Sequence, residues 1–162
     1  MAFGFKSPVR LRADGQYDLL FTADERYMLR TYLEQLRDLL LGDNDLLRRL
    51  FPPAYLDGDD HEREYQELMR GDLIESRFAA IETVEATLDE ACVDEATIQR
   101  WMQAINSLRL VVGTRLDVSE EPRTPDPEDP DFALYLLYET LGWMLAHIID
   151  AASQALPEPT ED

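Results

Sequence analysis

Apolar residues near the N-terminus alternate with small or polar ones, the period that places every second side chain on one face of a strand. They are Phe3, Phe5, Val9 and Leu11. Asp14-Gly15 follows as a turn signal, and residues 17–21 supply a return strand. The pattern therefore predicts a β-hairpin over residues 3–21. A two-stranded ribbon alone is marginal in water, so we expect it to lie against helices.

The spacing of apolar residues then changes to three and four, which is typical of helices with one buried face. Thr22 and Glu25 match a capping box at the start of the first helix. Gly71-Asp72 either separates two helices or lies in a bend, so the predicted number of helices is five or six. The last helix is apolar on most sides and is expected to be central. The predicted helices cover residues 22–41, 43–50, 62–70, 73–90, 95–116 and 131–156.

These elements predict a mostly α fold, a helical bundle with the N-terminal hairpin packed against it. A chain of 162 residues fits one domain, which we assign to residues 1–156 with helices over 22–156. Residues 117–131 contain four prolines and seven acidic residues, which is typical of a solvated, mobile loop. Residues 157–162 are expected to form a frayed tail.

The charge balance changes what the bundle is expected to bind. The chain has 15 Lys and Arg against 34 Asp and Glu, a net charge of −19 at pH 7. Such a surface repels phosphate backbones and anionic lipid surfaces. We therefore expect no unaided binding of nucleic acid and no membrane association, and we expect contacts with protein partners instead.

One cysteine, Cys92, rules out an internal disulfide and a multi-cysteine zinc site, which suits a reducing cytoplasm. The N-terminal residues lack the continuous apolar core of a signal peptide. The most apolar stretch, residues 132–149, is interrupted by Glu139 and His147, so a core helix explains it better than a membrane span. These features predict a cytoplasmic protein.

Candidate catalytic and metal motifs are incomplete. His61-Glu62 begins like the zinc motif HExxH, but the second histidine is absent. The acidic run 57–60 lacks the ligand spacing of an EF-hand. His147 and Asp150 can touch on the last helix, but no serine stands in a nucleophile motif. We therefore predict no metal, no cofactor and no catalysis.

A polar group on the helix at 95–116 is the most informative candidate. Asn106, Arg109 and Gly113 recur at i, i+3 and i+7, and Arg115 adds a second cation. They form either a polar groove for a partner or an internal lock between Arg109 and a carboxylate, Glu139 or Asp150. The lock is favoured, because a guanidinium suits bidentate pairing at a helix interface. Arg26, Arg30 and Arg37 are expected to form ordinary surface pairs.

Residues 101–116 read WMQAINSLRLVVGTRL, and residues 138–143 read YETLGW. Together with the hairpin and the capped helix, these runs resemble the actinobacterial oxidative-stress regulator AosR family, formerly catalogued as a domain of unknown function. The resemblance implies a cytoplasmic regulator encoded near a Clp-protease adaptor and cysteine-biosynthesis genes, which acts at promoters with a stress sigma factor. The family's redox switch is a CxxxC pair. Here Ala96 stands four residues after Cys92, so only an intermolecular switch through Cys92 stays open.

The leading hypothesis is therefore a non-catalytic regulatory protein that acts through protein partners such as a sigma factor. The alternative is an adaptor or accessory protein of Clp-type proteolysis. A third hypothesis is a small-molecule- or metal-dependent enzyme built around Arg109. The sequence leaves the oligomeric state open, a homodimer included.

Overall fold

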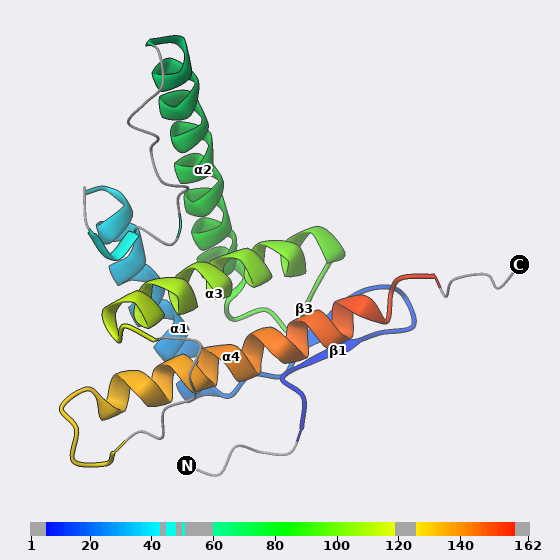
Figure 1. Ribbon diagram of the computed structural model, residues 1–162. Helices are drawn as coiled ribbons and strands as arrows, with labels where there is room; N and C mark the ends of the chain where they lie inside the picture. The colour runs from blue at the N-terminus through cyan, green and yellow to red at the C-terminus, as the bar shows by residue number, and fades with distance from the viewer. Residues whose placement is uncertain (1–5, 43–44, 48–49, 51–59, 119–125, 158–162) are drawn as a thin grey trace, which may run out of the picture.

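The computed structural model describes residues 6–42, 45–47, 50, 60–118 and 126–157 (Figure 1). Within these residues the chain is mostly helical, with a small antiparallel sheet near the N-terminus. The elements in chain order are β1 (Val9–Leu11), β2 (Tyr17–Leu19), α1 (Ala23–Leu40), the 3-10 turn η1 (Asp45–Leu47), α2 (Asp60–Thr87), β3 (Cys92–Val93), α3 (Glu95–Arg115) and α4 (Phe132–Ser153).

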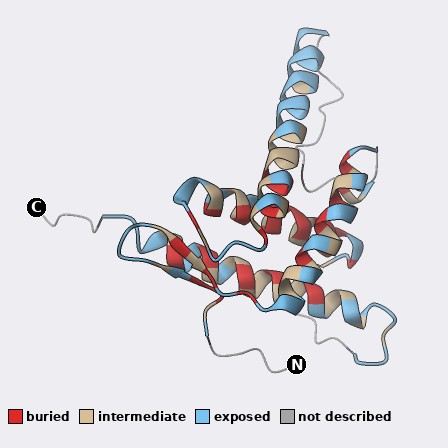
Figure 2. Cartoon of the chain, turned by 180° about the vertical axis from the view of Figure 1, so that it is seen from behind, coloured by how far each residue is buried: buried red, intermediate tan, exposed pale blue. Residues whose placement is uncertain are grey.

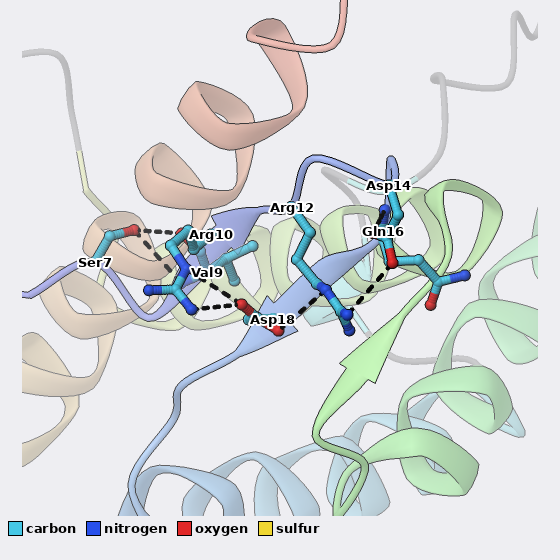
Figure 3. A network of polar contacts seen from close by, with 7 residues as sticks. All are labelled: Ser7, Val9, Arg10, Arg12, Asp14, Gln16 and Asp18. Atoms are coloured by element: carbon cyan, nitrogen blue, oxygen red, sulfur yellow. Dashed lines mark hydrogen bonds and ion pairs between the residues drawn. The ribbon is translucent and has the colours of Figure 1, made fainter.

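The predicted hairpin is confirmed between Val9 and Leu19, which are paired across β1 and β2. Gly15 has φ +83°, a conformation that favours glycine and closes the turn. Figure 3 shows Asp18 of β2 between two arginines: it lies 2.7 Å from Nη2 of Arg10 and 3.9 Å from Nε of Arg12. These cross-strand ion pairs fix the register on the exposed face.

A third strand, β3, extends the hairpin into a sheet with the order β1-β2-β3. Val93 pairs with Tyr17, and the sheet thereby connects the N-terminus to the link between α2 and α3. Tyr17 is fully buried. Its burial is the main cause that raises the pKa of its phenol, and the nearby negative charge of Glu95 raises the pKa further. The sequence did not predict this strand.

The predicted count of five or six helices is wrong for the described residues, which contain four α-helices and one 3-10 turn. Gly71 and Asp72 lie inside α2, a single helix of 28 residues. A mid-helix glycine lowers helix stability by only about 1 kcal/mol, which is not enough by itself to end a helix of this length. The short helix predicted over 43–50 is described only in part, as the single turn η1.

The prediction that the last helix, α4, is the central one is also wrong. α3 packs against both α2 and α4, and 10 of its 21 residues are buried, against 5 of 22 in α4 (Figure 2). α4 buries one stripe only, Leu137, Leu141, Met144, Ile148 and Ala151. By length and composition α4 is the one helix of the described chain that could cross a membrane, which by itself does not indicate one.

Several predictions fall on residues that lie outside the described ranges. They concern Phe3 and Phe5 of the hairpin, residues 57–59 of the acidic run, residues 119–125 of the proline-rich loop and residues 158–162 of the tail. The single domain over 1–156 stays a prediction. It agrees with one cluster of buried apolar side chains to which the sheet and all four helices contribute.

Candidate functional site

The predicted polar group on α3 does not form one continuous face. Asn106 and Arg109 are half-buried and Gly113 is buried, while Arg115 is exposed. At 100° per residue, Arg115 lies on the side of the helix opposite Asn106. Asn106 and Gly113 lie on the same side of α3 as Arg109, and Arg115 lies apart from them; Arg109 is the residue of the group whose guanidinium meets α4.

Arg109 meets an aromatic ring where a carboxylate was expected. Its guanidinium carbon lies 4.4 Å from the centroid of the Tyr138 ring on α4, a cation–π contact. Among the described residues no ion pair joins Arg109 to Glu139 or Asp150, and its buried Nε has no hydrogen-bond partner. The predicted Arg–carboxylate lock is wrong, and a cation packed on a ring takes its place.

Gly142 leaves the space that Arg109 fills. A Cβ at Gly142 would lie 3.1 Å from Nε of Arg109, closer than ordinary van der Waals contact. Tyr138 and Gly142 stand four residues apart on α4, so the ring and the gap lie on one side of the helix. A glycine four residues after a tyrosine, in the run at 138–143, is the sequence signal for this contact.

A comparison with protein families covers almost all of this architecture. The family model DUF2017, a domain of unknown function, matches residues 4–152. The chain belongs to the DUF2017 family. The match includes the sheet, all four helices and both motif runs, 101–116 and 138–143. No curated protein and no solved structure matches the chain. What this DUF2017 chain does must therefore be argued from its own contacts.

Arg26 connects three parts of this DUF2017 fold: α1, the end of β2 and the residues just after α2. Its guanidinium donates to the carbonyls of Leu19 and Phe21 at the end of β2, at 2.9 and 3.1 Å. It also donates to the carbonyls of Leu88 and Glu90 just after α2. The expectation of an ordinary surface pair is wrong for Arg26, because one cation here satisfies backbone oxygens from two distant segments.

The other arginines of α1 also reach a neighbouring helix. Arg37 lies 2.7 Å from Glu85 on α2, and Arg30 lies 3.0 Å from Asp89 just beyond it. The expected surface pair is confirmed for Arg30, whose pair is exposed on both sides, and both pairs join α1 to the region of α2. Together with Arg26 they form a line of cations along α1 that holds the C-terminal half of α2.

The contact between α2 and α3 is polar as well as apolar. Arg77 donates to the Ser107 hydroxyl at 2.9 Å, and burial lowers the pKa of its guanidinium. The indole Nε1 of Trp101 donates to Thr87 at 2.8 Å, and its ring stacks on Phe21 with centroids 5.3 Å apart, so the largest fully buried side chain is fixed at both its ring and its nitrogen. These bonds orient the C-terminal half of α2 relative to α3.

The structure places each of the remaining candidates, Cys92, His61 and His147, beside a different neighbour. Cys92 is half-buried in β3, with Sγ 3.8 Å from Oε1 of Gln16. His61 is exposed, and its Nδ1 lies 4.0 Å from Glu64. The His147 ring packs edge-on against Trp143, with centroids 5.1 Å apart. Within the described part of the chain no cluster of three His, Cys, Asp or Glu residues could hold a metal.

Proposed function

We propose that this chain is a non-catalytic regulatory protein of the AosR type, which acts by binding other proteins such as a stress sigma factor in the cytoplasm. The observation that carries the proposal is the outward excess of negative charge. The net charge is −19, and most described arginines are already engaged with groups of the chain itself. Asp and Glu outnumber Lys and Arg by more than two to one, and most of the described acidic side chains are exposed to solvent and to any partner.

A surface of this kind steers association with a basic partner and raises its on-rate. A stress sigma factor with a basic face fits that requirement, and so does any regulator that binds DNA through its own cations. Because an acidic surface repels DNA, the protein would act at a promoter indirectly, through a partner that itself binds the DNA. Arg109, the residue at the centre of the enzyme hypothesis, is engaged in packing α4 against α3, which favours a structural role for it over a catalytic one.

The proposal is tested by purifying the tagged full chain from its native cell and identifying bound proteins by mass spectrometry. We expect a sigma factor whose recovery falls as salt rises from 50 to 500 mM, because screening weakens contacts between exposed charges. Recovery of Clp components in place of a sigma factor would support the proteolysis adaptor. Turnover of a small molecule by the purified chain would overturn the non-catalytic role.

Binding to DNA without a partner separates direct from indirect action. Naked promoter DNA at physiological salt should not shift with the purified chain, and tight binding would contradict the electrostatic argument.

Peroxide treatment followed by non-reducing electrophoresis tests redox sensing. A covalent dimer that a Cys92→Ser variant abolishes would support an intermolecular switch, and a monomer throughout would refute it.

A further inference from the structure

The first half of α2 stands away from the rest of the protein (Figures 1 and 2). We call residues 60–72 the arm. None of its residues is buried, and all but Gln66 are exposed. A helical segment of this length is marginal without packing, and Gly71, with open space around it, lowers its stability further. Among the described residues, the elements outside the arm therefore do little to hold it.

Three large apolar side chains lie along the arm in spite of this exposure. Tyr65 is 63% exposed, Leu68 64% and Met69 41%. Positions i, i+3 and i+4 lie on one side of a helix, so the three form a single apolar stripe. The stripe has the spacing of the anchors that an amphipathic helix presents to a protein partner.

The arginines of the arm lie on the side of the helix away from the apolar stripe. Arg63, Arg70 and Arg77 recur every seven residues and form one line. Arg77 is bonded to Ser107 of α3, so this line begins on the side that faces the rest of the protein. At 100° per residue the apolar stripe lies about 150° away from that line. Glu64 and Glu75 lie along one edge of the stripe, and Asp72 lies within it, between Leu68 and Tyr65 around the helix.

We propose that the apolar stripe of the arm is the docking face for a basic, amphipathic helical segment of a partner protein. The proposal rests on the proposed function and names the surface and the chemistry of its partner. Lysine or arginine residues flanking an apolar seam would pair with Glu64, Asp72 and Glu75, while apolar side chains cover Leu68. A second copy of this chain would bring the same acidic flanks together and repel.

The test is site-specific photo-crosslinking in the full chain within its native cell. Tyr65 is replaced by the photoreactive p-benzoylphenylalanine, and Tyr27 of α1 serves as the matched control because it is 69% exposed. We expect the Tyr65 position to crosslink a lysine- and arginine-rich helical segment of another protein, with at least tenfold lower yield from Tyr27. Crosslinks to a second copy, to nucleic acid or with equal yield from both positions would overturn the proposal.

A point variant distinguishes this proposal from the general function. Leu68→Gln should lower recovery of the crosslinked partner at least tenfold, as expected for loss of a central apolar anchor. Leu41→Gln, at a position 75% exposed, should leave recovery unchanged. Unchanged far-UV circular dichroism verifies that both variants fold. If the partner still binds Leu68→Gln normally, docking on the arm is refuted and the regulatory function stands. If no partner crosslinks or copurifies at all, both fail.

Discussion

The contacts of Arg26 lead to a specific prediction about stability. One guanidinium donates to four carbonyls, those of Leu19, Phe21, Leu88 and Glu90, and thereby joins α1 to the ends of β2 and α2. Replacing Arg26 by methionine keeps the length of the side chain and removes every donor. The carbonyls after α2 also lose a cation that interacts favourably with the helix dipole.

The magnitude follows from the kind of bond that is lost. A hydrogen bond from a charged donor contributes about 1.5–3 kcal/mol when it is partly buried, and bonds that share one group are not additive. Arg26 is half-buried, so water reaches part of the site and replaces some donors. We expect Arg26→Met to lower the free energy of unfolding by about 3 kcal/mol.

The matched control is Arg30→Met, one turn along the same helix. Arg30 makes one ion pair, with Asp89 at 3.0 Å, and both side chains are exposed. Exposed pairs contribute about 0.2–1 kcal/mol, so the two variants should differ by on the order of 2 kcal/mol. Urea unfolding followed by circular dichroism at 222 nm measures both. With a slope of about 2 kcal/mol per molar, Arg26→Met should shift the midpoint by about 1.5 M.

If Arg26→Met proves no more destabilising than Arg30→Met, the four-carbonyl contact contributes nothing beyond a surface charge. An Arg26→Lys variant gives an independent measurement. Lysine keeps the charge but offers a single ammonium group, which cannot reach both ends of the site at once. We expect it to recover less than half of the lost stability, and full recovery would show that charge alone matters.

Two further predictions concern glycine and a helix cap. Gly71→Ala should raise the free energy of unfolding by about 0.5–1 kcal/mol, because Gly71 is helical with open space around it, whereas Gly142→Ala should gain less because its Cβ meets Arg109. Urea titration compares the two, and equal gains would show that Arg109 moves aside freely. Hydrogen bonds from the side chain and backbone of Thr97 lower the pKa of Asp94, so its stabilising effect is present above the ordinary aspartate pKa and is lost as pH falls through the lowered value. Asp94→Asn keeps the cap without this titration, so its stability should vary less with pH below about 4, and an unchanged pH profile would contradict the assignment.

Local signals in the sequence predicted local structure correctly. The Thr22–Glu25 capping box forms with both of its hydrogen bonds. The turn at Asp14-Gly15 also lies where the sequence placed it. Each of these features is decided within about four residues, where side chain and backbone are already neighbours in the chain.

Contacts between distant segments could not be predicted in the same way. β3 consists of two residues, Cys92 and Val93, too few to show any periodicity, and its pairing partner lies more than 70 positions earlier. The ring beside Arg109 depends on how α4 is rotated against α3, which a single helical pattern does not define. Charge complementarity suggested a carboxylate for Arg109, but Tyr138 is the group that the packing brings to it.

The central helix shows why hydropathy alone misplaced the core. α4 is the more apolar helix, yet α3 is buried on more sides because two helices flank it. α3 tolerates burial of Ser107 and Thr114 since each hydroxyl donates to a carbonyl four residues earlier in its own helix. Once a polar side chain is satisfied within its own helix, position between neighbours decides burial. The same packing therefore buries a satisfied polar residue on α3 and leaves an apolar residue on the outer side of α4 exposed.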